Sequence, residues 1–209
     1  MEREQDSSRS SIGDVICEFL EVAFNQLLYT RGVYPDGIFR KSKKYGVAVM
    51  TNCHPELGQY IRNVLTGLKT LMLTGDVGKV VLQITSYDEK PLERFVFELC
   101  MFAMEQIDTS SSYSIEQYLR DLLLKINTCD CMLTPLKKEC SFLITVETKE
   151  STARDMANNE EFQAFPWVRA DKIDGNNGES PNIIPLKSCN TELFSIQCFV
   201  VEEIQNKSN

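Results

Sequence analysis

Residues 12–29, IGDVICEFLEVAFNQLLY, are the starting point for predicting the fold class, because they contain the first expected helix of the chain. Their apolar side chains recur with the spacing of one face of an amphipathic helix. These side chains are Ile12, Val15, Ile16, Phe19, Ala23 and Leu27. Ser11 and Asp14 resemble a capping box at the start of the helix. We therefore expect a helix here that packs against a core, preceded by a polar tail over residues 1–10.

Two more helices are expected further along the chain. Pro55 stands at a favourable first-turn position of the second, and Gly75 is a typical residue for its end. Ser114 and Gln117 form another capping box before the third. Its apolar stripe contains Ile115, Tyr118, Leu119, Leu122, Leu123 and Ile126. The helical content is thus predicted as three amphipathic helices.

Alternating apolar and polar residues between and after these helices indicate strands. The expected strands cover residues 47–50, 80–85, 92–99, 142–147 and 193–201. The second and third are separated by the turn-forming Tyr87-Asp88-Glu89-Lys90-Pro91, which predicts an antiparallel hairpin. Three helices beside an antiparallel sheet define an α+β fold.

Residues 149–188 show little periodicity, although they include isolated large apolar side chains. Those side chains are Phe162, Phe165, Trp167, Ile183, Ile184 and Leu186. An irregular stretch of this length in a compact domain is either a disordered tail or a functional segment that orders against something. The aromatic residues favour the second interpretation.

Composition argues against several classes of function. The net charge is −8 and the pI about 4.8, which opposes direct nucleic-acid binding because phosphate contacts need clustered cations. The basic run Arg40, Lys41, Lys43 and Lys44 is expected to be a solvated hairpin edge, with a phosphate contact as the alternative. No apolar stretch approaches a membrane span, so we expect a soluble, intracellular chain without membrane contact.

The eight cysteines are scattered and no secretory signal accompanies them, so reduced and mostly buried thiols are expected. Cysteine–histidine catalysis would have to use His54, the only histidine, with Cys53. A turn or cap role is sufficient for His54, and we expect no catalytic residues. Cys129 and Cys131 lack the spacing and the second ligand pair of a zinc site, so no metal is expected. The sequence around Gly75 and Gly78 lacks the motif of a phosphate-cradling loop, so no nucleotide cofactor is expected either.

Seven blocks of sequence carry a resemblance to one family. They are CEFLEVAFNQLLYTRGVYP (17–35), GIFRKSKKYGVAV (37–49), CHPELGQYI (53–61), ERFVFEL (93–99), LLLKI (122–126), FPW (165–167) and IPLK (184–187). Together they resemble the mitotic-arrest-deficient-like HORMA proteins that serve as the accessory subunit of DNA polymerase zeta. The blocks are in order and cover nearly the whole chain.

The resemblance implies a HORMA fold, in which three helices pack on an antiparallel sheet and a C-terminal seat-belt segment crosses a bound peptide. The expected domain covers residues 11–203, with a core at 11–148, a seat-belt region at 149–203 and a polar tail at 204–209.

The resemblance also implies site residues. Tyr60 and Trp167 match positions that pack against a Pro-containing peptide of the polymerase zeta catalytic subunit; the alternatives are a core aromatic for Tyr60 and a domain-closing anchor for Trp167. Ile183, Gln197 and Phe199 match positions that contact the C-terminal domain of the Rev-type deoxycytidyl transferase scaffold. Phe199 stands where the family commonly has Tyr.

Arg120 matches a residue of the surface through which HORMA domains form homodimers or heterodimers, and its alternative is a solvated charge. The implied role is a non-catalytic adaptor in translesion synthesis and DNA damage tolerance, acting in the nucleus with or without a cytoplasmic pool. The alternative functions are a spindle-checkpoint HORMA protein that regulates the cell cycle and an enzyme using Cys53 and His54.

Overall fold

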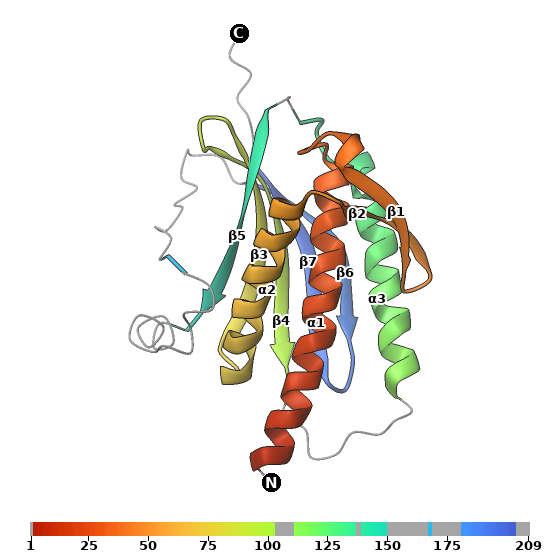
Figure 1. Cartoon of the computed structure of the whole chain (residues 1–209), viewed down its shortest axis with the longest axis vertical. Coiled ribbons are helices and arrows are strands. Elements are labelled where there is room, and N and C mark those ends of the chain that lie inside the picture. Colours follow the sequence, from red (N-terminus) through yellow and green to blue (C-terminus); the bar gives the residue numbers. More distant parts are fainter. Residues whose placement is uncertain (1, 103–110, 137–138, 150–166, 169–180, 204–209) are drawn as a thin grey trace.

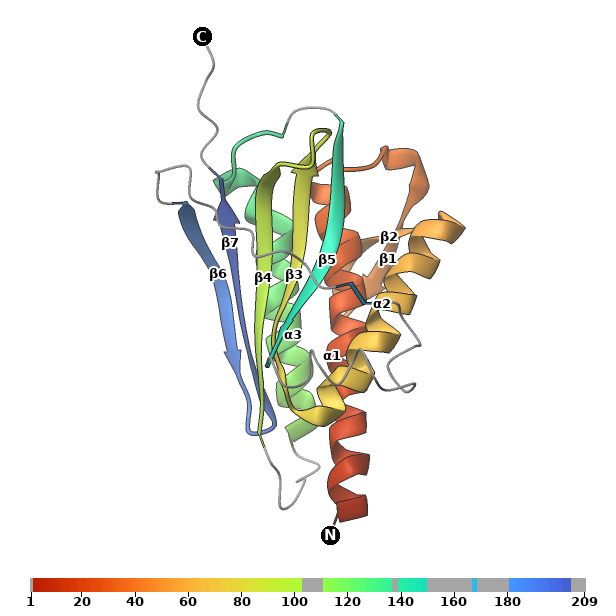
Figure 2. The ribbon, with the colours of Figure 1, turned by 90° about the vertical axis from the view of Figure 1, so that its left-hand side faces the viewer.

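Among the residues that the structure describes, three α-helices lie on one face of a five-stranded antiparallel sheet (Figures 1 and 2). The computed structural model describes residues 2–102, 111–136, 139–149, 167–168 and 181–203. The helices are α1 (Glu2–Thr30), α2 (Pro55–Thr74) and α3 (Ser111–Thr128). The sheet strands are β3 (Val77–Ser86), β4 (Pro91–Met101), β5 (Cys140–Thr148), β6 (Asn182–Asn190) and β7 (Phe194–Glu202).

The strand order in this sheet is β5-β3-β4-β7-β6, and the α+β class expected from the sequence is confirmed. A separate two-stranded ribbon consists of β1 (Phe39–Lys44) and β2 (Val47–Asn52). Short 3-10 turns precede β1 (η1, Asp36–Ile38) and follow α3 (η2, Cys129–Met132). The basic run at residues 40–44 is thus one strand of a hairpin, as expected.

Helix boundaries were predicted well for α2 and less well for the other two. Pro55 is the first residue of α2, and Gly75 ends it in the left-handed conformation (φ 74°), with its N–H donating to the Met72 carbonyl at 3.0 Å. By contrast, α1 begins at Glu2 and α3 at Ser111. The caps expected at Ser11 and Ser114 are therefore wrong, and most of the tail expected at residues 1–10 belongs to α1.

The core lies between the helices and the sheet. Side chains of α1 are its centre: Phe19 and Phe24 are fully buried and meet Phe97 of β4 edge to face, with ring centroids 6.5 and 5.8 Å apart. The strand residues Leu82 and Ile84 of β3 are also fully buried. Phe19 belongs to the stripe predicted from residues 12–29, and it packs on the sheet as expected, whereas Phe24 was not part of that stripe.

Strand β6 is the element that sequence analysis missed. It lies within the stretch read as irregular, contains Pro185, and is the last strand of the sheet. Its register with β7 shifts between Pro185 and Lys187, which disrupts the alternation that would have revealed a strand. Proline is tolerated there because an edge strand leaves one row of backbone groups unpaired.

A buried ion pair fixes the end of α1 to the sheet. Arg31 is 6% exposed, and Glu93 of β4, which is 1% exposed, accepts hydrogen bonds from its guanidinium at 2.9 and 2.5 Å. The guanidinium also donates to the Thr134 carbonyl at 2.6 Å and pairs with Asp130 of η2. One side chain therefore joins α1, β4 and the segment after α3.

All eight cysteines are free thiols, and they are less buried than expected. Cys129, Cys189 and Cys198 are buried, Cys17 and Cys140 are half-buried, and Cys53, Cys100 and Cys131 are exposed. The described helices include none that is long and apolar enough to cross a membrane.

Candidate functional site

The outer edge of β5 is the most distinctive feature of the sheet. β5 pairs with β3 on one side, and the C-terminal hairpin β6–β7 pairs with β4 at the other side of the sheet. No described strand pairs with the outer edge of β5. An unpaired edge presents backbone N–H and C=O groups that can bind another extended chain.

Tyr60 of α2 reaches this edge. Its ring packs edge to face on Phe142 of β5, with centroids 5.6 Å apart, and Phe142 also contacts Tyr34 at 6.0 Å. Burial raises the pKa of the Tyr60 hydroxyl, and a hydrogen bond with the backbone of Ile144 lowers it. A bond that lowers the pKa of a phenol favours the phenolate, so the Ile144 N–H is the donor and the Tyr60 oxygen the acceptor.

This hydrogen bond fixes which backbone groups of β5 point outward. The N–H and C=O of one residue lie on the same side of an antiparallel strand, and the sides alternate along the chain. Since the Ile144 N–H points to Tyr60, the backbone groups of Phe142 and Val146 also face the outer edge. Those of Leu143 and Thr145, which stand opposite Gln83 and Val81, face β3.

Trp167 lies on the same side of the molecule. It packs, half-buried, against the hydrophobic core, whereas its neighbour Val168 is 87% exposed. Both ribbon views place the short segment 167–168 on the outer side of β5 (Figures 1 and 2). Tyr60 and Trp167, which the resemblance assigned to one peptide site, thus both lie on the outer side of β5. Their contact with a peptide stays a prediction.

Ile183, Gln197 and Phe199 come together on the sheet face that points away from the helices. Ile183 stands opposite Val201 in the β6–β7 register, and Gln197 and Phe199 share the orientation of Val201 along β7. Ile183 is 60% exposed, Gln197 is exposed and Phe199 is half-buried. The three residues predicted to contact the scaffold polymerase therefore form one accessible surface, away from the edge of β5.

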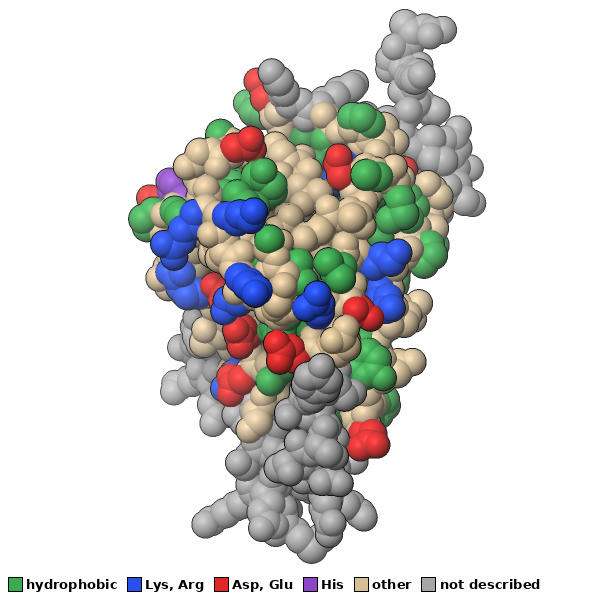
Figure 3. All heavy atoms as spheres, turned by 90° about the vertical axis from the view of Figure 1, so that its right-hand side faces the viewer, with side chains coloured by type: hydrophobic (Ala, Val, Ile, Leu, Met, Phe, Trp, Pro, Cys, Tyr) green, Lys and Arg blue, Asp and Glu red, His purple; other side chains and the backbone are tan. Residues whose placement is uncertain are grey.

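Arg120 lies on a third surface, shared by α3 and the β1–β2 ribbon. Its guanidinium covers the turn of the ribbon, where a Cβ added to Gly46 would be 2.6 Å from one of its nitrogens. Exposed Arg40, Lys41 and Lys43 of β1 add to the blue side chains seen on this face in Figure 3. Arg120 thus extends across two elements; its role in HORMA pairing stays a prediction.

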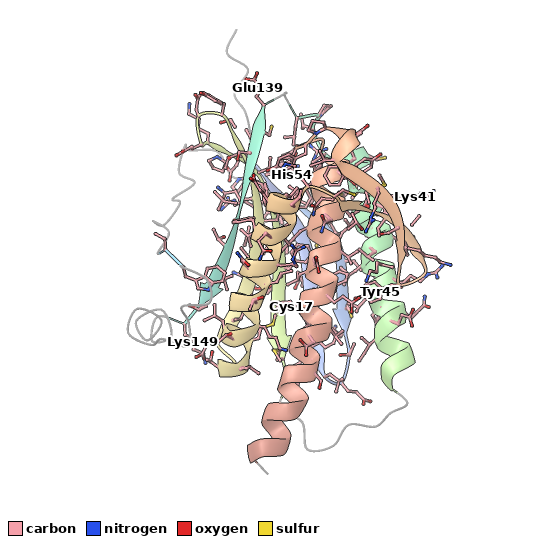
Figure 4. All side chains as sticks on the ribbon, viewed as in Figure 1. Cys17, Lys41, Tyr45, His54, Glu139 and Lys149 are labelled. Atoms are coloured by element: carbon pink, nitrogen blue, oxygen red, sulfur yellow. The ribbon has the colours of Figure 1, made fainter. Side chains whose placement is uncertain are left out.

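Cys53 and His54 are both exposed at the surface, just before α2 (Figure 4). The His54 carbonyl accepts a hydrogen bond from the Gly58 N–H at 3.0 Å, which is a helix-start role. No cluster of three or more metal-ligating side chains occurs among the described residues. The geometry of the described residues gives Cys53 and His54 no third partner.

Two residues of the site were not singled out from the sequence. Phe142 was predicted only as a strand residue, and Tyr34 appeared only within the block of residues 17–35 that carries the resemblance. Both are aromatic contacts of the Tyr60 cluster. Their chain positions carry no signal for this, because the cluster joins segments that are far apart in sequence.

For the described residues, the unpaired edge of β5 and the C-terminal hairpin beside β4 define an α+β fold with an open sheet edge. Residues 13–159 match the family model of the HORMA domain, and the chain belongs to the HORMA-domain family. It is 41% identical over 198 residues to "Mitotic spindle assembly checkpoint protein MAD2B" of Bos taurus, which covers 94% of this chain and 93% of the relative.

A more distant relative is "DNA polymerase zeta processivity subunit" of Arabidopsis thaliana, 27% identical over 205 residues, covering 96% and 90% of the two chains. Among solved structures, a chain of "Crystal Structure of Mitotic Checkpoint Complex" superposes with a TM-score of 0.77 at 24% identity, covering 93% and 99%. "Structure of C. elegans HTP-2 bound to HIM-3 closure motif" gives 0.70 at 12% identity, covering 92% and 90%. These two structures confirm the fold.

Proposed function

We propose that the chain is a non-catalytic adaptor subunit of the translesion DNA polymerase zeta, and that it captures an extended, Pro-containing segment of the catalytic subunit along the outer edge of β5. The observation that carries this proposal is the outward row of backbone groups on β5, with Tyr60 and Trp167 nearby on the outer side of this strand. The name of the Arabidopsis thaliana relative supports the choice of polymerase.

Pairing with β5 supplies affinity, and the flanking aromatics supply specificity. A peptide strand would meet the outward groups of Phe142 and Val146, and its side chains would reach Tyr60 on the helix side of the edge. We propose that the seat-belt region expected at residues 149–203, much of which lies outside the described residues, closes over the bound strand. Closure makes dissociation slow, because the belt must reopen before the peptide leaves.

The second contact of the adaptor uses strands β6 and β7, which lie at the other end of the strand order from β5. We propose that Ile183, Gln197 and Phe199 bind the C-terminal domain of the Rev-type deoxycytidyl transferase, while Arg120 serves HORMA pairing. Because these surfaces do not overlap with the edge of β5, one chain can bind the peptide and the scaffold together and bridge them. This role belongs to DNA damage tolerance and to the nucleus.

A second candidate function is regulation of the cell cycle as a spindle-checkpoint HORMA protein. The name of the Bos taurus relative, at 41% identity, favours it. It would use the same edge of β5 for a checkpoint target peptide. The two functions therefore differ in the peptide that is captured rather than in the site.

Isothermal titration distinguishes them. Extended Pro-containing segments of the catalytic subunit of polymerase zeta from the same organism are titrated into the full chain, alongside a checkpoint target peptide. Submicromolar binding of the former alone is expected; preference for the latter would move the protein to the checkpoint function. Failure of both peptides to bind would refute capture at this edge.

Trp167→Ala tests the site itself, with Val168→Ala as the matched control. Trp167 is packed on the core and Val168 is 87% exposed, so only the first change removes a buried contact. Truncation of an interface aromatic is expected to weaken peptide binding by more than about 1 kcal/mol, roughly fivefold. Equal affinities of the two variants would remove Trp167 from the site.

A further inference from the structure

A hollow of about 640 Å³ lies at the end of the sheet where β3 turns into β4 and β5 begins. Gln83 and Thr85 of β3 and Ser141 and Leu143 of β5 line it. On β3 these residues alternate with Leu82 and Ile84, which are fully buried on the helix side. The hollow therefore opens on the face that points away from the helices.

The floor of the hollow consists of two buried polar side chains. Gln83 is 3% exposed and Thr85 is 4% exposed. Neither side chain forms a hydrogen bond with another residue of the described part of the chain. Buried amide and hydroxyl groups are normally hydrogen-bonded in native proteins. Since both side chains line the hollow, their hydrogen-bonding groups are available to a group that enters it.

The rim of the hollow is acidic and aromatic. Glu89 of the β3–β4 turn and Glu139 before β5 are both exposed and line it, and neither forms an ion pair with a described residue. Figure 4 shows Glu139 at the start of β5. Tyr87, 84% exposed, completes the rim. The charges of the neighbouring Asp88 and Lys90 cancel. The net charge at the rim is therefore negative and comes from the two glutamates.

We propose that this hollow is a specificity subsite for one basic side chain, Lys or Arg, of the peptide captured at β5. The inference rests on the proposed function, because it places that peptide on the adjacent edge. Arg suits the hollow better than Lys: its planar guanidinium carries five donors for the two carboxylates and the Gln83 carbonyl, and it stacks on an aromatic ring such as Tyr87.

The position of the hollow relative to β5 predicts which residue of the bound peptide enters it. Side chains of a strand point alternately to the two faces of a sheet. A peptide paired with the outer edge of β5 therefore directs every second side chain to the face on which Gln83, Thr85 and Ser141 lie. The side chain level with the first residues of β5 is the one beside the hollow, whereas its neighbours along the peptide face the helices or solvent.

The test is an arginine scan of the captured peptide. Each position of a neutral, Pro-containing peptide is replaced by Arg in turn, and the affinity for the full chain is measured by isothermal titration. We expect one position, near the start of β5, at which Arg tightens binding about fivefold, as for a charge-assisted hydrogen bond at a partly buried site. Glu at that position should weaken binding.

Variants of the chain connect that preference to the hollow. Glu89→Gln with Glu139→Gln keeps the size of both side chains and removes both charges, so the preference for Arg should disappear while the neutral peptide still binds. Asp88→Asn removes a charge from the same turn without touching the hollow and should preserve the preference. Gln83→Leu should also weaken the preference for Arg, because it removes the side-chain carbonyl at the floor of the hollow.

The outcomes separate the two proposals. If the neutral peptide binds but no position prefers Arg, or if the double variant keeps the preference, the subsite is refuted and the capture of peptides by β5 stands. If no peptide binds at all, the proposed function fails and the subsite fails with it.

Discussion

Replacing Arg31 by Met should destabilise the domain more than any exposed charge substitution. The guanidinium is buried, and it forms two hydrogen bonds with Glu93 and one with the Thr134 carbonyl. Without it, a carboxylate that is 1% exposed loses its counter-charge. Removing one member of a buried pair costs about 3–5 kcal/mol, because the remaining charge is desolvated without compensation.

The other contacts of Arg31 change this magnitude little. The Asp130 side chain is 56% exposed, so its pairing with Arg31 is screened by solvent and contributes at most about 1 kcal/mol. A loss of about 3–5 kcal/mol is a large part of the roughly 5–15 kcal/mol that a domain possesses. For a chain of 209 residues this corresponds to a melting temperature lower by about 6–20 °C.

Urea denaturation followed by circular dichroism measures the effect, with the same m-value required for each variant. The control is Lys44→Met, which breaks the exposed pair with Glu18 (2.9 Å) and should cost less than about 1 kcal/mol. The double variant Arg31→Met with Glu93→Met should recover most of the loss, since an apolar pair leaves no buried charge.

The pH dependence of the Arg31→Met variant has a definite sign. Burial raises the pKa of Glu93, and the bond to Arg31 lowers it. In the folded Arg31→Met variant the pKa of Glu93 should therefore lie further above its unfolded value than in the wild type. A carboxyl group with a raised pKa in the folded state contributes stability at low pH and loses it as pH rises through that pKa. The stability gap to the wild type should therefore narrow as pH falls from 7 to 5.

Two results would refute this reasoning. One is a cost of less than about 1 kcal/mol for Arg31→Met, which would mean that Glu93 finds another partner or solvent. The other is a double variant no more stable than the single one, which would show that the loss comes from packing of the arginine stem rather than from an unpaired charge.

The remaining predictions concern thiols, the scaffold surface and the edge of β5. Burial raises the pKa of Cys17 and of Cys129 to about 12 and that of Cys189 to about 11, so these thiols stay protonated at pH 8 and should resist alkylation until the domain unfolds, as mass spectrometry can show. The fast-reacting thiols should be the exposed Cys53, Cys100 and Cys131. Phe199→Tyr should strengthen binding of the scaffold domain about threefold to tenfold through one added hydrogen bond, measured by calorimetry; unchanged affinity would remove that contact. Tyr60→Phe should accelerate amide exchange at Ile144, and no change would contradict the assigned donor.

Local signals in the sequence predicted the helices and most strands. Pro55 and Gly75 delimit α2 because their backbone preferences act within a single turn. The helix starts predicted at Ser11 and Ser114 were wrong, because a capping pattern inside a longer helix looks the same in the sequence as one at its start. Strand β6 was missed because Pro185 and the register shift after it remove its alternation.

Only the site residues that match the family, such as Tyr60 and Trp167, could be predicted from the sequence. On pattern alone Tyr60 belongs to the apolar stripe of α2 and looks like any core aromatic. That β5 is an edge strand depends on the docking of the C-terminal hairpin beside β4, which no local pattern encodes. The hollow joins residues 83–89 to residues 139–143, and only the paired strands bring their side chains together.

Residue-resolved amide exchange, with and without the Pro-containing peptide of the catalytic subunit, tests the central claim most directly. Bound peptide should slow exchange at Phe142 and Val146, whose N–H groups face the outer edge of β5. Leu143 and Thr145, already paired with β3, are the internal control and should change little. Binding that leaves Phe142 and Val146 unprotected would contradict capture of the peptide at this edge.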